Sequence, residues 1–476
     1  MRIIFVEAKS PDLHIYSRMP LPRLGTILLA TILRDRGHDA RVQIEELGRI
    51  RMEDIETADA VGISIITSTA PRGYEFARIF RKMGKTVFIG GAHATYLPEE
   101  ALLHCDYVLR GEADDTIVPF IEALERKSGF EEVGGLSWWR GGTVVHNPNT
   151  AYIKNMDKSP IPDFRLITNW EKKMDVTPIM TSRGCPYDCE FCSVSNMFGR
   201  QFRHKSTERV LAELRQHKEL CRENGVKNPD DWIFFYDDNF TINKKRAKEL
   251  LRAMISENLT PHWTAQASVD VADDDELLGL LKKSNCYLLY IGFESINPET
   301  LKAYNKKQTV EKIEKAIHKL RQYGIRVHGM FVFGADTDDA SVISGTAAFA
   351  KRNKLHSVQF MILTPLPGTR TYQELTRQER ITTRDWQLYD AHHVVFEPAH
   401  FSQHGLQYDT ITAMLSFYGL RHILKRAFFL LLRLHDLKRG LIEISIKLYG
   451  HRTLKHWFQQ KKEWIAALPH HTKGLK

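Results

Sequence analysis

The sequence predicts an α/β protein with an N-terminal doubly wound parallel sheet, a partial (β/α)6 barrel and a C-terminal helical appendage. Short apolar runs alternate with helical stretches over residues 1–130 and again over residues 176–375. This alternation, with glycine at the junctions, is typical of parallel strands joined by crossover helices. After about residue 410 the strand-like runs stop, and apolar residues recur at helical spacing.

The composition is that of an ordinary globular protein. The chain has 476 residues, of which 43% are hydrophobic and 26% charged, enough for two or three domains. The first residues read as a strand rather than a signal peptide, and no apolar run reaches the roughly 18 residues that a transmembrane helix needs. Six cysteines are too few for a disulfide framework. We therefore expect a cytoplasmic protein.

Residues 1–130 are expected to form a Rossmann-like sheet. The expected strands are Ile3–Val6, Ala40–Ile44, Val61–Ile65, Thr86–Ile89 and Tyr107–Leu109, and the expected helices are Leu24–Arg36, Arg72–Met83, Pro98–His104 and Thr116–Arg126. Ligands of such sheets bind beyond the carboxyl ends of the strands. The candidate cofactor-binding residues at these ends are Ser64, Thr67, Gly90, Gly91, His93 and Glu112. They fit either a large flat ligand or simple tight turns, whereas a nicotinamide cofactor is not supported because G-x-G-x-x-G is absent.

A hairpin and a proline-rich linker are expected over residues 131–175, before the barrel at residues 176–375. The six expected barrel strands are Val176–Thr181, Trp232–Tyr236, His262–Ala267, Tyr287–Phe293, Val327–Phe333 and Ser357–Leu363. Active sites of barrels lie at the C-terminal ends of the strands. Asp237 and Asp238 follow the second strand, and Glu294 follows the fourth.

Three cysteines follow the first barrel strand. Cys185, Cys189 and Cys192 fall within eight residues, spaced C-x3-C-x2-C. Closely spaced thiolates hold iron–sulfur clusters, and three of them leave one iron of a [4Fe–4S] cluster open to a substrate. The alternatives are a zinc site completed by His204 or three unrelated thiols. Zinc sites use a second C-x2-C pair, which is absent here.

The segment from Arg183 to Cys192, with Phe191 inside the last cysteine gap, resembles the radical S-adenosylmethionine (SAM) superfamily. The resemblance implies that the three cysteines bind the cluster and that its open iron chelates SAM. SAM would then be cleaved to methionine and a 5′-deoxyadenosyl radical, which takes hydrogen from an unactivated C–H bond. The expected SAM contacts are Glu294, Asp238 and the backbone near Phe191. Helix capping is the alternative role of Asp237 and Asp238.

The front domain is similar to that of the cobalamin-dependent radical SAM family. The segments 22–25, 90–95 and 110–112 resemble the branch that contains the anaerobic magnesium-protoporphyrin ester cyclase, hopanoid methylases and phosphinate methylases. This implies that the domain presents the upper face of cobalamin to the radical site. The D-x-H-x-x-G motif that supplies a cobalt ligand is absent, and His14, His38 and His93 do not sit in one. The lower axial ligand is therefore unassigned.

The resemblance implies an enzyme that methylates an unactivated carbon of a small-molecule or lipid substrate. One SAM would methylate reduced cobalamin, a second would yield the radical, and an external donor would supply electrons. No catalytic side chain is assigned. Radical cyclisation of a tetrapyrrole or lipid is the close alternative. An RNA methylthiotransferase would need three further cluster cysteines in the front domain, where only Cys105 occurs. A cobalamin sensor would need no cluster at all.

Four further residues have an expected role beside an ordinary one. Arg200 and Arg203 suit a phosphate or carboxylate partner, or a solvated turn. Tyr389 and His393 lie in a segment that resembles the cover of the barrel mouth in relatives, and either residue suits substrate contact or simple packing. Cys105, Cys221 and Cys286 are expected to be buried apolar residues.

The C-terminal tail is basic. From Ile411 to Lys476 we count 13 Lys/Arg and 3 Asp/Glu, a net charge of +10 against +9 for the whole chain. A basic helix that also carries Trp457, Phe458 and Trp464 can lie in a membrane interface. That would place the protein at the inner membrane face and favour an apolar substrate. The alternative is that the apolar side chains pack on the barrel. No recognised nucleic-acid-binding motif accompanies the charge, so no nucleic-acid partner is expected.

Overall fold

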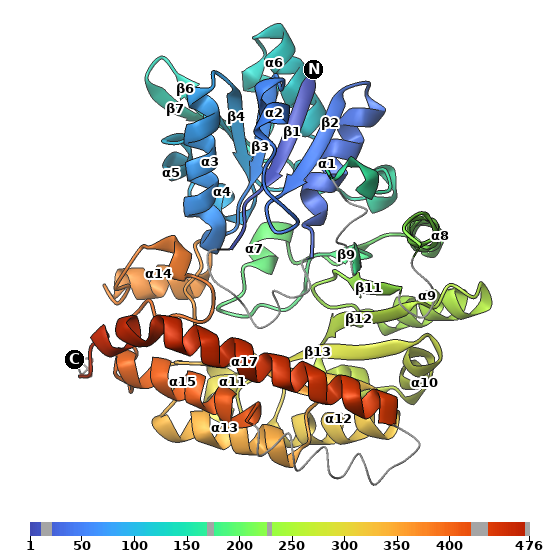
Figure 1. Cartoon of the computed structure of the whole chain (residues 1–476), viewed down its shortest axis with the longest axis vertical. Helices are drawn as coiled ribbons and strands as arrows, with labels where there is room; N and C mark the ends of the chain where they lie inside the picture. The colour runs from blue at the N-terminus through green and yellow to red at the C-terminus, as the bar shows by residue number, and fades with distance from the viewer. Residues whose placement is uncertain (11–20, 169–175, 226–230, 420–436, 472–476) are drawn as a thin grey trace.

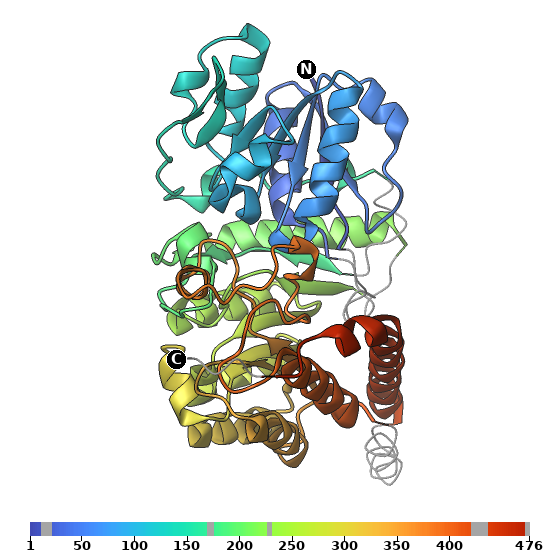
Figure 2. The same ribbon diagram turned by 90° about the vertical axis from the view of Figure 1, so that its left-hand side faces the viewer.

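The computed structural model describes residues 1–10, 21–168, 176–225, 231–419 and 437–471. They form two stacked sheet domains with a helical C-terminal region beside the second (Figures 1 and 2). The front sheet has the strand order β2-β1-β3-β4-β5-β6-β7. Its strands are β1 (Arg2–Glu7), β2 (Asp39–Ile44), β3 (Ala60–Ser64), β4 (Thr86–Gly90), β5 (Tyr107–Leu109), β6 (Leu136–Arg140) and β7 (Thr143–His146). The first five run parallel, which confirms the predicted sheet.

Helices cover both faces of the front sheet. They are α1 (Leu24–Asp35), α2 (Met52–Glu56), α3 (Ala70–Lys82), α4 (Ala92–Tyr96), α5 (Pro98–Leu102) and α6 (Ile117–Arg126). Alternate side chains of a strand point to opposite faces. Accordingly, Ile3 and Phe5 share a core with α1 and α6, whereas Ile4 and Val6 share one with α3. The carboxyl ends of the strands face the barrel domain (Figure 1).

The hairpin β6–β7 was expected in the connecting segment, but it extends the front sheet. β6 pairs antiparallel with β5, placing Leu136 opposite Leu109, and β7 pairs with β6. Leu136 is buried in the core that α1 and α6 share. The sheet of the front domain therefore continues to His146, and the linker begins after it. The linker contains the short 3-10 turns Met156–Lys158 and Phe164–Leu166.

The second domain is the predicted partial barrel, open on one side. Its six-stranded sheet has the order β15-β14-β13-β12-β11-β8, with all neighbours parallel. The strands are β8 (Thr177–Ile179), β11 (Trp232–Phe235), β12 (His262–Ala267), β13 (Cys286–Glu294), β14 (Arg326–Phe333) and β15 (Ser357–Ile362). The helices are α7 (Val194–Phe198), α8 (Thr207–Glu223), α9 (Lys244–Ser256), α10 (Asp275–Lys283), α11 (Pro298–Ala303), α12 (Val310–Gln322) and α13 (Ala340–Arg352).

Burial alternates along the barrel strands. On β12, half-buried His262, Thr264 and Gln266 alternate with buried Trp263 and Ala265. The buried set belongs to the core under the surrounding helices. The half-buried set therefore lines the concave face of the open barrel.

The C-terminal region is helical where the structure describes it. After α14 (Arg370–Arg377), helix α15 (Gln403–Phe417) packs on β15 and α13, and α17 (Leu437–Ala467) lies along α15 (Figure 1). Trp457 and Ile465 of α17 are buried against Ile411. These contacts favour the packing alternative for the tail, although the apolar run at residues 427–432 lies outside the described residues. Among the helices of the described ranges, none is long and apolar enough to cross a bilayer.

Candidate functional site

The three motif cysteines lie on one loop that is closed at its base. The two-residue strands β9 (Ser182–Arg183) and β10 (Arg203–His204) pair antiparallel and bracket residues 184–202. Gly184 opens the loop with φ +85°, and a Cβ there would lie 2.5 Å from the carbonyl oxygen of Gln201. Only glycine fits this turn. The loop geometry thus follows from the sequence just before Cys185.

The cysteine side chains suit a cluster better than a single metal ion. All three are free and half-buried. Burial, with a smaller contribution from the neighbouring Cys189 and Cys185, raises the pKa of Cys192 to about 12, so iron must displace the proton. Within the part of the chain that the structure describes, no three His, Cys, Asp or Glu side chains gather closely enough for one ion. His204, the candidate fourth zinc ligand, is exposed.

Backbone N–H groups already point at the sulfurs. The pKa of Cys185 is raised by burial and partly lowered by a hydrogen bond from the backbone of Tyr187. Cys192 receives the same kind of bond from Val194. Such bonds stabilise the thiolate form and tune a bound cluster. The three cysteines therefore fit a [4Fe–4S] cluster as its protein ligands.

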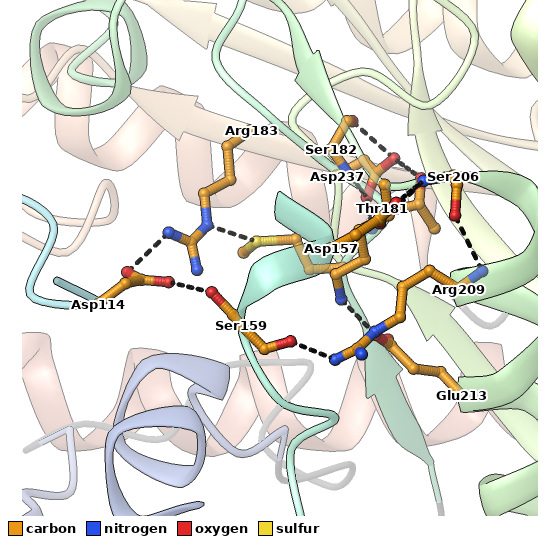
Figure 3. A network of polar contacts seen from close by, with 12 residues as sticks. Asp114, Asp157, Ser159, Thr181, Ser182, Arg183, Ser206, Arg209, Glu213 and Asp237 are labelled. Carbon is orange, nitrogen blue, oxygen red and sulfur yellow. Dashed lines mark hydrogen bonds and ion pairs between the residues drawn. The ribbon is translucent and has the colours of Figure 1, made fainter. Parts of the chain in front are cut away.

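Asp237 fixes the chain that leads into this loop. Its buried carboxylate accepts hydrogen bonds from the backbone N–H groups of Thr181 and Ser182 at 2.6 and 3.1 Å. It also accepts from both hydroxyls, that of Ser182 at 2.8 Å. These contacts, drawn in Figure 3, make Asp237 a positioning residue for the loop rather than a helix cap.

Asp238, its neighbour, faces the cysteines. Burial and the adjacent Asp237 together raise the pKa of Asp238 to about 6, although a hydrogen bond donated by the backbone of Gly184 lowers it. Its charge in turn raises the pKa of the Cys185 and Cys192 thiols. A carboxyl group so placed suits a cationic ligand at the cluster.

Glu294 lies at the end of β13 and is held by a residue that the sequence did not single out. Its Oε1 lies 2.8 Å from the ammonium of Lys306. Burial lowers the pKa of Lys306, but the Glu294 carboxylate together with the nearby Cys189 and Cys192 outweighs this and the pKa is raised, so the amine stays charged. Gly292 makes room, because a Cβ there would lie 2.3 Å from Glu294 Oε1.

The segment after α11 covers the cysteine loop. The ring of Phe191 packs edge-on against Tyr304 with centroids 4.9 Å apart. Asn305 donates through Nδ2 to the carbonyl of Asp188 at 3.0 Å. Lys306 follows directly, between the loop and Glu294. These contacts bring the predicted residues Phe191 and Glu294 to one site.

The carboxyl edge of the front sheet fits a flat cofactor at some of the predicted positions. Ile66, between Ser64 and Thr67, is 44% exposed although most large apolar side chains of this domain are buried. Gly91 has φ +101°, and a Cβ there would lie 2.3 Å from the carbonyl oxygen of Ile65. Gly91 thus lets the loops after β3 and β4 lie against each other, whereas a Cβ at Gly90 would make only an ordinary contact, 3.5 Å from the carbonyl oxygen of Leu109. This edge offers an apolar rim and small polar side chains toward the barrel.

Two predicted cofactor residues have other partners. His93 is fully buried, with Nε2 3.2 Å from Glu100 and its ring against Trp386. Its contacts tie the segment after the barrel to the front domain and do not support a cofactor role. The carboxylate of Glu112 is taken up by Arg203 at 2.6 and 2.8 Å. It therefore acts as a structural partner of the barrel.

The remaining candidates resolve into packing or pairing. Arg200 pairs with Asp188 at 2.6 Å. The Tyr389 hydroxyl donates to the carbonyl of Thr383 at 2.7 Å, and buried His393 lies 3.0 Å from Asp390. Cys105 and Cys286 are buried as expected, whereas Cys221 is half-buried beside His217.

Two family models match the chain. One is described as B12 binding domain and matches residues 15–121, and the other, Radical SAM superfamily, matches residues 179–342. The match of residues 15–121 to the B12 binding domain contradicts the RNA methylthiotransferase alternative, because that alternative requires a cluster-binding domain at the N-terminus.

Curated relatives match most of the chain. An uncharacterized methyltransferase of Pyrococcus horikoshii is 32% identical over 412 residues, which cover 83% of this chain and 88% of that protein. The bacteriochlorophyllide d C-12(1)-methyltransferase of Chlorobaculum tepidum is 31% identical over 407 residues, covering 85% and 84%. The hopanoid C-3 methylase of Methylococcus capsulatus is 28% identical over 409 residues, covering 82% and 76%.

The fold and the site define a radical SAM enzyme with a cobalamin-binding front domain, and the chain belongs to the cobalamin-dependent radical SAM family. Its cofactors are a [4Fe–4S] cluster, SAM and cobalamin. The fold is shared with a solved structure, the cobalamin-dependent SAM radical enzyme OxsB with aqua-cobalamin and SAM bound. The two agree with a TM-score of 0.71 at 15% identity, over 97% of this chain and 84% of that one.

Proposed function

We propose that the protein methylates an unactivated carbon of an apolar, ring-bearing small molecule or lipid. The observation that carries the proposal is that the cysteine loop and the carboxyl edge of the front sheet share one interdomain face, where Glu112 of the front domain binds Arg203 at the base of the loop. Both cofactor sites thus open toward each other. Relatives named as a bacteriochlorophyllide d methyltransferase and a hopanoid methylase support methylation, and a relative named as an anaerobic magnesium-protoporphyrin IX monomethyl ester cyclase supports the cyclisation alternative.

When bound, the cluster and cobalamin supply the radical and methyl-transfer chemistry. Each turnover breaks one substrate C–H bond and forms one C–CH3 bond. One SAM leaves as S-adenosylhomocysteine, and a second accepts the substrate hydrogen and leaves as methionine and 5′-deoxyadenosine. Two electrons from an external donor balance the reaction.

The residues of this chain have separate tasks in the proposal. Cys185, Cys189 and Cys192 bind iron and leave one iron open. Glu294, with Lys306 held against it at 2.8 Å, and Asp238 bind the polar groups of SAM. Asp237 keeps the loop in place through its hydrogen bonds to Thr181 and Ser182.

The concave face of the barrel supports a ring-bearing substrate. Half-buried rings on β11, directly after it and on β13 form an aromatic wall, and the buried ring of His328 on β14 packs against it. Phe234 lies 6.0 Å from Tyr236 and 5.8 Å from Tyr290, and Tyr290 lies 4.9 Å from His328, centroid to centroid. Burial lowers the pKa of His328 to about 3, so this ring is uncharged near neutral pH. Such a wall favours an apolar ring over a charged or strongly hydrated ligand.

Anaerobic turnover with SAM that carries a CD3 group tests the proposal. The reconstituted protein is given a chemical reductant and either bacteriochlorophyllide d or a hopanoid, and products are analysed by mass spectrometry. We expect transfer of the label to carbon of one probe, together with equimolar 5′-deoxyadenosine. A product that has lost hydrogen and carries no label would assign cyclisation instead. Cleavage of SAM with no labelled product from either probe would contradict the proposal.

A further inference from the structure

Two arginines at the base of the cysteine loop reach across the domain boundary. Arg183 on β9 and Arg203 on β10 stand opposite each other in the antiparallel pair. Both point to the loop that follows β5 of the front domain, which carries Glu112 and Asp114. We call Glu112, Asp114, Arg183 and Arg203 the interdomain bridge. Its Asp114–Arg183 half is drawn in Figure 3.

The contacts of the bridge are short and shielded from solvent. Arg183 Nη1 lies 2.9 Å from Asp114 Oδ2 and 3.6 Å from Glu112 Oε1. Arg203 holds both oxygens of Glu112 in a two-pronged pair. The four side chains are only 3–10% exposed. Because Cys185 follows Arg183 by two residues, the interdomain bridge contacts the loop directly beside its first cysteine.

The front-domain end of the bridge continues to the edge that faces the barrel. The backbone N–H of Gly111 donates to the hydroxyl of Thr95 at 3.0 Å, and that hydroxyl donates to the carbonyl of Gly91 at 2.9 Å. Asp114 also accepts from Ser159 of the linker at 3.2 Å. An unbroken series of polar contacts and short covalent steps thus runs from the loop after β4 to Cys185.

Stability alone is a poor reason for this arrangement. Desolvating two ion pairs cancels most of their attraction, and apolar residues of similar size commonly stabilise a protein as well. What ion pairs add over apolar packing is a fixed geometry, since a two-pronged arginine–carboxylate pair allows little rotation or sliding. At this boundary, that geometry sets how the front sheet lies over the cysteine loop.

We propose that the interdomain bridge positions the cobalamin-binding edge relative to the cluster loop, so that both cofactors are held at one distance and tilt. Its four residues are positioning residues and touch neither substrate nor reacting atoms. This positioning role deepens the proposed function. Only the turnover measurement below depends on the proposed methylation, and the EPR measurement does not. Small misplacements matter in such sites, where a shift of about 1 Å costs up to about a hundredfold in rate.

The test is a spin–spin measurement on the full chain loaded with cluster and cobalamin. The cluster is reduced and the cobalt is brought to its paramagnetic Co(II) form, and pulsed EPR gives the distribution of distances between the two. We compare the wild type with Asp114→Asn, Glu112→Gln and the charge-conserving Arg183→Lys. The control is Asp336→Asn, which neutralises the carboxylate that lies 2.6 Å from Arg380, an arginine whose side chain is also 3% exposed but is not part of the interdomain bridge.

We expect a single narrow distribution in the wild type and in Asp336→Asn, and a broadened or shifted one in Asp114→Asn and Glu112→Gln. Arg183→Lys keeps the positive charge but not the two-pronged guanidinium geometry, so its distance distribution should lie between those of the wild type and the neutral variants. If the neutral variants do not fold, as a melting curve would show, Arg183→Lys supplies the same comparison. Folded bridge variants with the wild-type distribution would overturn the inference.

A turnover measurement separates this inference from the proposed function. In bridge variants, methylated product per 5′-deoxyadenosine should fall about tenfold, while Asp336→Asn keeps the wild-type ratio. A wild type that cleaves SAM but never methylates would contradict the proposed function alone, because the EPR comparison needs no substrate. An unchanged ratio in variants with a changed distance would also count against the bridge.

Discussion

The ammonium of Lys306 lies 2.8 Å from the carboxylate of Glu294 at the end of β13. Glu294 adopts a left-handed backbone conformation, φ +63°, which costs a non-glycine residue roughly 1 kcal/mol or more. The register of β13 against β14 shifts at this point. This backbone strain occurs at the residue whose side chain turns toward the cysteine loop, and strained residues of this kind are typical of binding sites.

Removal of the Lys306 charge should weaken SAM binding. In Lys306→Gln, Glu294 loses its partner and swings free, so we expect about tenfold weaker SAM binding to the reduced cluster, with Lys306→Arg close to wild type. EPR titration with SAM measures this. Gly292→Ala should act similarly, because its Cβ would displace the Glu294 carboxylate. The control is the exposed neighbour Lys307→Gln. Wild-type affinity in both Lys306→Gln and Gly292→Ala would refute the role.

The loop cysteines should be indispensable for SAM cleavage. Cys189→Ala removes one of three iron ligands, so 5′-deoxyadenosine formation should be lost while the front domain still binds cobalamin. Cys221→Ala, a half-buried cysteine outside the loop, is the control and should keep its iron content and activity. The measurements are iron analysis, product chromatography and the cobalamin spectrum. Normal 5′-deoxyadenosine formation by Cys189→Ala would show that the cluster is ligated elsewhere.

Asp237→Asn should loosen the cysteine loop without touching iron. The change replaces an acceptor oxygen with a donor among four hydrogen bonds, which costs several kcal/mol locally. We expect cluster occupancy to fall severalfold at equal protein yield. Asp338→Asn is the matched control, since Asp338 is another buried carboxylate that binds two backbone N–H groups, those of Gly334 and Ala335. Equal iron loss in both variants would assign the effect to general destabilisation.

His217 should make the barrel acid-sensitive. Burial lowers the pKa of His217 to about 4, from an ordinary value of 6.5. Because His217 binds a proton more readily in the unfolded chain than in the folded one, acid lowers the free energy of unfolding. The stability is at its full value above pH 6.5 and falls as the pH is lowered toward 4. The change amounts to about 3 kcal/mol. Urea unfolding at a series of pH values should show a smaller decrease in the free energy of unfolding between pH 6.5 and pH 4 in His217→Gln than in the wild type. The exposed His318→Gln should follow the wild type.

No histidine of the described front domain should bind cobalt. His93 is fully buried between Glu100 and Trp386, and the ring of His38 lies 3.2 Å from the N-terminal amine, so both rings are already packed against protein groups. His93→Gln and His38→Gln should leave the Co(II) EPR spectrum of the bound cobalamin unchanged. His14 lies outside the described residues, and we make the same prediction for it from the missing motif. Loss of a nitrogen hyperfine pattern in any of the three variants would contradict this.

The secondary structure followed closely from local pattern. The strand β12 has the predicted bounds, His262–Ala267, because apolar and polar residues alternate along it and its ends are marked by Pro261 and Ser268. The hairpin β6–β7 was also foreseen, but its membership in the front sheet was not. The sheet edge to which a hairpin adds depends on which edge lies nearby in the folded protein, and the residue pattern of one strand does not determine this.

The sequence by itself was enough to predict the parallel sheets, the cofactor class and the three cysteines proposed to bind the cluster, because each prediction depends on residues close together in the chain. The tertiary structure alone decided which polar residues meet. Lys306 reaches Glu294 across helix α11, and Arg203 reaches Glu112 across 91 residues. It also buried the ring of His93 against Glu100 and Trp386. The sequence does not distinguish a charged or imidazole side chain that binds a ligand from one that binds another side chain. Only the packing of distant segments determines its partner.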